Sequence, residues 1–148
     1  MKIFRLSVLL LFLLGCEETP EYVFTVFELN QVTVSPAGEP FGVRTENGNT
    51  MTVNTVELTD SRCPINVLTC TKYGDYRVEL EIVQGLDTAI VSLCNGDCNS
   101  NVEIMDSVQF TLKNIPYWIR MRSLLPFPNT ARPDIVQNIT FEVFLDKD

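Results

Sequence analysis

Histidine is absent from the 148-residue chain, and tryptophan occurs only once. Histidine is the commonest general base in enzymes and the commonest metal ligand, so its absence removes the usual side chain for both chemistries. The serines and threonines lack the base that normally activates them as nucleophiles. We therefore expect a non-catalytic protein that holds no cofactor and no metal ion.

The chain also has no apolar run long enough to span a bilayer and no convincing amphipathic helix. Its longest run of almost wholly apolar residues is the nine residues 6–14, whereas a membrane-spanning helix needs about 20. Lys2 and Arg5 precede this run, and Gly15 follows it. A short basic segment, an apolar run and a small residue are typical of a secretory signal peptide. Residues 1–15 are therefore predicted to be a signal peptide that is cleaved.

The signal peptide ends in Leu13-Leu14-Gly15-Cys16, which resembles the lipobox of bacterial lipoproteins. The resemblance implies that Cys16 is acylated, with palmitate or a similar chain, and becomes the new N-terminus. Each acyl chain contributes about 0.8 kcal/mol per buried methylene, which is enough to hold a protein at a membrane. We expect a lipid anchor in the bacterial outer membrane, on either its periplasmic or its outer side. A plain signal peptide that ends near a cysteine by chance is the alternative.

Residues 16–22 are predicted to form a lipidated tether. They include Glu17, Glu18 and Glu21, which act either as a solvated spacer or as an acidic signal for export to the cell surface. Loss of residues 1–15 takes the formal charge from −8 to −10, because Lys2 and Arg5 are removed. Such an acidic domain repels phosphate backbones, so we expect no nucleic acid among its partners. A glycan or an envelope protein is the expected partner.

Four cysteines remain after Cys16, and an even number in an exported protein favours disulfides. Three pairings are possible. Proximity favours Cys63–Cys70 and Cys94–Cys98, since each pair flanks a turn-rich segment. A four-cysteine zinc site is the alternative, but neither spacing is the usual two-residue knuckle.

Apolar and polar residues alternate along most of the remaining chain, which predicts about eight short strands in residues 23–148. A one-residue slip in the alternation after Val53, before Val56 and Leu58, predicts a β-bulge. Residues 24–29 and 32–34 are weaker strand candidates. The fold class that fits is an all-β, antiparallel β-sandwich of immunoglobulin-like type with two local disulfides. A closed barrel is the alternative. The clearest alternating runs are Tyr76/Val78/Leu80/Ile82, Ala89/Val91/Leu93, Val108/Phe110/Leu112 and Ile139/Phe141/Val143/Leu145.

One motif, Asp60-Ser61-Arg62-Cys63-Pro64, is followed by Cys70 and by Gly74 at the start of a strand. Together with Leu125-Pro126-Phe127-Pro128, this pattern resembles a group of small bacterial lipoproteins. The resemblance implies a β-sandwich and a disulfide between Cys63 and Cys70, and it implies no activity. Asp60 and Arg62 are candidates either for a structural role, bonded to each other or to nearby carbonyls, or for presentation of loop 60–74 to a partner, as in protein inhibitors.

A second candidate site lies in the strand from Tyr117 to Arg122. Period-2 alternation places Trp118, Arg120 and Arg122 on one face, opposite the core side. An indole beside two guanidinium groups would bind an anionic or sugar-like ligand by stacking and charge. The alternative is a tryptophan that covers the sheet while the arginines pair with acids elsewhere.

Two further patterns are weaker. Glu79 and Glu81 share one strand face and are the candidate acid and base of a glycan-processing enzyme. The alternative is that they are solvated surface residues without a catalytic role, which is the commoner case for two glutamates on an exposed face. Alternate oxygen-bearing side chains in residues 97–103 resemble a calcium loop but lack its glycine and its final glutamate. These side chains are Asp97, Asn99, Asn101 and Glu103.

Overall fold

The computed structural model describes residues 24–70, 74–98 and 106–145, which form nine strands. The strands are β1 (Val26–Glu28), β2 (Val32–Pro36), β3 (Phe41–Arg44), β4 (Thr50–Asp60), β5 (Asp75–Gln84), β6 (Asp87–Gly96), β7 (Ser107–Leu112), β8 (Ile115–Leu125) and β9 (Asn138–Leu145). No helix in the described part of the chain is long and apolar enough to cross a membrane. The predicted signal peptide, the lipidation site Cys16 and the tether lie outside the described residues.

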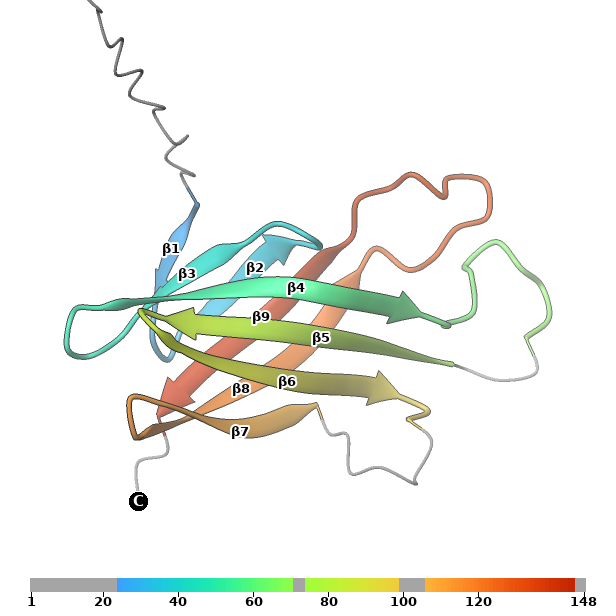
Figure 1. Ribbon diagram of the computed structural model, residues 1–148. Helices are drawn as coiled ribbons and strands as arrows, with labels where there is room; N and C mark the ends of the chain where they lie inside the picture. Colours follow the sequence, from blue (N-terminus) through green and yellow to red (C-terminus); the bar gives the residue numbers. More distant parts are fainter. Residues whose placement is uncertain (1–23, 71–73, 99–105, 146–148) are drawn as a thin grey trace, which may run out of the picture.

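The strands pack as two sheets (Figure 1). One sheet has the order β1-β3-β4-β5-β6, and the other has the order β2-β9-β8-β7. Neighbouring strands are antiparallel, except that β1 runs parallel to β3. The all-β sandwich that the sequence predicts is confirmed, with nine strands among the described residues where about eight were expected.

The core between the sheets is built from the alternating residues that the sequence indicates. Burial of one Val, Leu, Ile or Phe side chain contributes roughly 1.5–3 kcal/mol, so a strand keeps its apolar face inward. Phe41 of β3 and Phe141 of β9 stack across the core with ring centroids 5.6 Å apart, which joins the two sheets. The buried side chains of β5 and β8 include Tyr76, Val78, Leu80, Ile82, Tyr117, Ile119 and Met121.

The predicted bulge lies in β4. The register between β4 and β5 shifts between Thr55 and Glu57, so that Val56 is the extra residue. Val53 is fully buried before the shift, Val56 is exposed, and Leu58 packs against the core after it. The bulge therefore returns the apolar residues of β4 to the inner face, as the slip in the alternation indicates.

Strand β2 reverses the usual pattern, because its valines face outward. Val32 and Val34 are exposed, whereas Thr33 and Ser35 are buried. The cause is the register with β9, which places Thr33 opposite Phe141, a residue of the core face. Directly opposed residues of an antiparallel pair share a face, so the hydroxyl side chains of β2 point inward.

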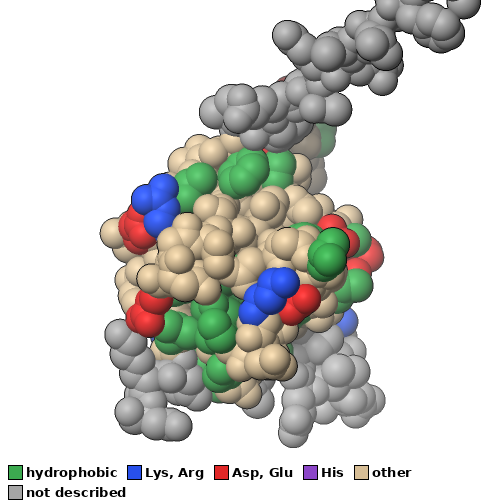
Figure 2. Space-filling model, turned by 60° about the vertical axis from the view of Figure 1, so that its left-hand side comes forward, with side chains coloured by type: hydrophobic (Ala, Val, Ile, Leu, Met, Phe, Trp, Pro, Cys, Tyr) green, Lys and Arg blue, Asp and Glu red, His purple; other side chains and the backbone are tan. Residues whose placement is uncertain are grey.

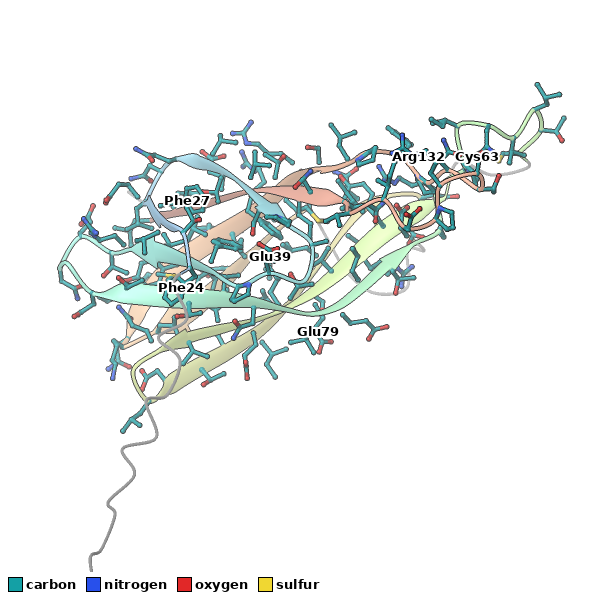
Figure 3. The ribbon with its side chains drawn as sticks, turned by 90° about the horizontal axis from the view of Figure 1, so that it is seen from above. Phe24, Phe27, Glu39, Cys63, Glu79 and Arg132 are labelled. Atoms are coloured by element: carbon teal, nitrogen blue, oxygen red, sulfur yellow. A yellow bond between two sulfur atoms is a disulfide. The ribbon has the colours of Figure 1, made fainter. Side chains whose placement is uncertain are left out.

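The two ends of the sandwich differ. The tight β3–β4, β5–β6 and β7–β8 turns lie at one end, and the segments after β4 and between β8 and β9 lie at the other (Figure 1). Phe24, the first described residue, lies far from Cys63 and Arg132, which lie together (Figure 3). We call residues 60–70 and 125–137 the loop end. At the opposite end, Figure 2 shows basic and acidic side chains beside each other rather than a patch of one sign.

Candidate functional site

The two segments of the loop end are bonded to each other. The backbone N–H of Ile65 donates to the carbonyl of Pro128 at 3.0 Å. The backbone N–H of Thr130 donates to the side-chain oxygen of Asn66 at 3.1 Å, and the Asn66 amide donates to the Thr130 hydroxyl. Residues that are 63 and 64 positions apart thus form one surface.

A buried ion pair forms the base of this surface. Arg62 donates from Nε to Asp60 Oδ1 at 2.8 Å and from Nη2 to Oδ2 at 2.7 Å. The Arg62 and Asp60 side chains are only 8% and 9% exposed. Gln137 donates to the same Asp60 Oδ2 at 2.7 Å. Burial alone would raise the pKa of Asp60, but the hydrogen bonds from Arg62 and Gln137 hold that pKa below its ordinary value.

The Arg62 guanidinium is also stacked between two aromatic rings. Its Cζ lies 4.6 Å from the ring centroid of Tyr76 and 4.4 Å from that of Phe127. Nη1 donates to the carbonyl of Leu124 at 2.7 Å, so every guanidinium nitrogen is bonded within the protein. Burial raises the pKa of Tyr76. This geometry agrees with the structural role for Arg62, because the guanidinium is not available to a partner.

Disulfides join Cys63 to Cys70 and Cys94 to Cys98, which are the two pairings that proximity favours. The four sulfur atoms are therefore bonded to each other in pairs and are not thiolates that could bind zinc. Cys63–Cys70 closes the first segment of the loop end directly after Arg62. The two parts of the motif, residues 60–64 and 125–128, meet at Arg62 and Phe127, and the Leu125–Pro126 peptide bond is cis.

Phe127 lines two pockets of the loop end and is itself 45% exposed. The first pocket, of about 280 Å³, has an apolar lining with polar groups at intervals. The second, of about 290 Å³, opens beside the stacked Arg62 and Tyr76. The lining of the first pocket includes Pro64, Phe127, Asn129, Arg132, Ile135 and Gln137.

Large apolar side chains are exposed on the loop end. They make up half of the exposed large apolar residues in the described part of the chain, and Leu68 is fully exposed. Beyond the buried pair of Asp60 and Arg62, the only charged residues of the loop end are Arg132 and Asp134. An apolar surface depleted of charge is characteristic of the core of a protein interface. The exposed side chains are Ile65, Val67, Leu68, Leu125, Phe127 and Val136.

The second predicted site, on β8, faces outward as expected, but its side chains contact their own sheet. Trp118 stacks on Phe144 of β9 with centroids 6.4 Å apart and an interplanar angle of 9°. The Cζ of Arg120 lies 5.3 Å from the same ring, and Arg122 pairs with Glu142. This arrangement favours the alternative in which Trp118 covers the sheet and an arginine pairs with an acid.

The structure adds little support for the two weaker candidates, the glutamate pair and the calcium loop. Glu81 accepts a hydrogen bond from Asn54 at 3.3 Å, whereas Glu79 lies opposite Glu57. A pocket of about 150 Å³ contains Glu79 but not Glu81. Of the possible calcium ligands, only Asp97 belongs to the described residues; Asn99, Asn101 and Glu103 lie outside them.

The loop end contains candidate functional residues that the strand periodicity of the sequence did not single out. Phe127 was visible only as part of a motif, and Arg132 only as one of four cations in a segment without acids, residues 107–133. Gln137 and Leu68 carried no signal, because irregular segments have no periodicity to interpret. Comparisons with family models, with curated proteins and with solved structures found no match for the chain. Function is therefore inferred from the geometry of the loop end.

Proposed function

We propose that the chain is a lipid-anchored, non-catalytic binding module of the bacterial cell envelope, and that it recognises a protein partner through the loop end. The observation that carries this proposal is a set of exposed apolar side chains on a cross-linked loop, held in place by the buried pair of Asp60 and Arg62. A surface that is rigid before binding loses little conformational entropy on binding. This function corresponds to the inhibitor-type alternative for loop 60–74, extended by residues 125–137.

The anchor supports a role at a membrane. The described chain begins at Phe24, away from Cys63 and Arg132 (Figure 3), so a tether through Cys16 leaves the loop end free to face a partner. Residues 16–23 span at most about 28 Å when fully extended. The domain would therefore stay close to the membrane surface.

Replacement of the anchoring residue tests the first half of the proposal. Cys16→Ser is expected to move the protein from the membrane fraction to the soluble fraction, because the acyl chains supply its affinity for the bilayer. The measurement is fractionation of cells followed by detection of the chain. A variant that stays in the membrane fraction would contradict lipidation at Cys16.

Site-specific photocrosslinking tests the second half. A photoreactive amino acid at Leu68 in intact cells is expected to give a discrete adduct with a partner protein. The same group at Leu86, which is equally exposed but lies in the β5–β6 turn at the opposite end, should give none. Phe127→Ser should weaken partner binding about tenfold or more, since aromatic anchors dominate interface energetics. The Leu68 adduct should then disappear.

Two results would contradict recognition through the loop end. The first is an identical pattern of adducts from Leu68 and Leu86, which would indicate random collision. The second is an adduct from Leu68 that Phe127→Ser leaves unchanged.

A further inference from the structure

Arg132 is an exposed cation in the lining of the first pocket, and no carboxylate of residues 24–70, 74–98 or 106–145 forms an ion pair with it. The other cationic side chains of the described residues have interaction partners within the protein. Five of them form ion pairs, and Arg120 lies over an aromatic ring. In a chain with a formal charge of −8, Arg132 is thus a described cation that is free to pair with a carboxylate of a partner.

The lining of the pocket that contains Arg132 is more apolar than polar. The ring of Phe127 and the side chain of Ile135 line it together with three prolines, Pro64, Pro128 and Pro133. The carboxylate of Asp60 also belongs to the lining, but it already accepts hydrogen bonds from Arg62 and Gln137. The pocket thus offers an apolar floor and one cationic group, which matches an apolar side chain next to a carboxylate.

We propose that this pocket holds an apolar side chain of an extended partner peptide, and that a carboxylate adjoining that side chain pairs with Arg132. The proposal rests on the proposed function and specifies the chemistry of the partner. Phe127 lines both this pocket and the second one of about 290 Å³. Side chains two residues apart in an extended segment point to the same side, so a segment that passes over Phe127 can place one side chain in each pocket.

A peptide fits this surface better than a lipid bilayer does. Arg132 belongs to the same pocket lining as Phe127 and Ile135. Transfer of a charged group into hydrocarbon is costly when no counter-charge accompanies it. A carboxylate of a peptide supplies that counter-charge at the pocket itself.

Selection of a random 12-residue peptide library displayed on phage, against the full chain in detergent, tests the proposal. The selected peptides are expected to carry Asp or Glu beside an apolar residue. Arg132→Gln should weaken their binding about tenfold by fluorescence polarisation, whereas Arg132→Lys should retain most of it. Arg44→Gln, which alters an exposed arginine of β3 at the opposite end, is the matched control and should change nothing. When Asp or Glu of the peptide is replaced by its amide, the affinity for the original chain should fall as much as it does with Arg132→Gln. The affinity for the Arg132→Gln variant should not change.

Each contrary outcome has a distinct meaning. Peptides that depend on Phe127 but neither carry an acid nor respond to Arg132→Gln would overturn this inference and leave the proposed function standing. If neither Phe127→Ser nor Arg132→Gln affects binding, both this inference and the proposed function are overturned. Dimerisation of the chain that Phe127→Ser abolishes would assign the surface to a second copy, and insertion into phosphatidylglycerol vesicles would assign it to lipid; each would overturn the inference.

Discussion

Arg62→Ala is expected to lower the free energy of unfolding by about 3–5 kcal/mol, because it leaves the Asp60 carboxylate buried without its counter-charge. The variant also removes the group that stacks between Tyr76 and Phe127. The loss is then larger than that of the ion pair alone. Urea unfolding, followed by the fluorescence of the single tryptophan, Trp118, measures it.

An exposed ion pair provides the control. Arg44 and Glu28 pair at 3.3 Å with side chains 53% and 51% exposed, so Arg44→Ala should cost no more than about 1 kcal/mol. Similar small losses for both variants would contradict the structural role of Arg62. The loss of stability in Arg62→Lys should lie between the losses in Arg62→Ala and Arg44→Ala, since lysine keeps the charge but not the planar guanidinium that bonds both oxygens of Asp60.

The cost of Arg62→Ala should also depend on pH. The pKa of Asp60 is lowered in the folded protein, so its contribution to stability is present above the unfolded pKa of about 3.9. That contribution is lost as the pH falls through the folded value. The difference between the original chain and Arg62→Ala should therefore shrink below about pH 4. The pKa of Asp75 is lowered as well, by hydrogen bonds from Ser61 and Arg77. The difference in unfolding free energy between the two proteins therefore isolates the contribution of Asp60 better than the pH dependence of either protein alone.

The strands with one apolar face could be predicted from the sequence, whereas those placed by register alone could not. Tyr76 to Ile82 and Ile139 to Leu145 alternate clearly, because each apolar residue faces the core. Strand β2 carries the opposite signal, since pairing with β9 turns Thr33 and Ser35 inward. Gln84 continues the core face of β5 and is 4% exposed, without a hydrogen-bond partner among the described residues. A polar residue at such a position cannot be assigned to the core from periodicity.

The parts of the loop end were visible in the sequence, but their contacts were not. Asp60 and Arg62 belong to the first part of a recognisable motif, and Phe127 belongs to its second part. The segment between β8 and β9 brings Phe127 to Arg62 and Gln137 to Asp60. No local sequence pattern predicts these contacts. The same limit applies to Trp118, whose outward direction follows from alternation. Its contact with Phe144 depends on the pairing of β8 with β9.

Removal of the Cys63–Cys70 disulfide, by Cys63→Ser with Cys70→Ser, is expected to lower the free energy of unfolding by about 2.5 kcal/mol. The estimate follows from the entropy of closing a short loop, here with a sequence separation of 7, in a model whose mechanism is disputed. The sheets do not depend on this bond, because it lies after β4 and before β5. Circular dichroism should therefore show unchanged strand content while urea unfolding shows the loss.

The disulfide is also expected to determine partner binding, since it holds Ile65, Val67 and Leu68 in one arrangement. Cys94→Ser with Cys98→Ser is the matched control: it opens a loop of sequence separation 4 at a cost of about 2 kcal/mol, and that loop carries none of the exposed apolar residues. Photocrosslinking from Leu68 should fail in the first variant and persist in the second. Equal loss in both would mean that binding follows overall stability, and the rigid loop would then have no special part in recognition.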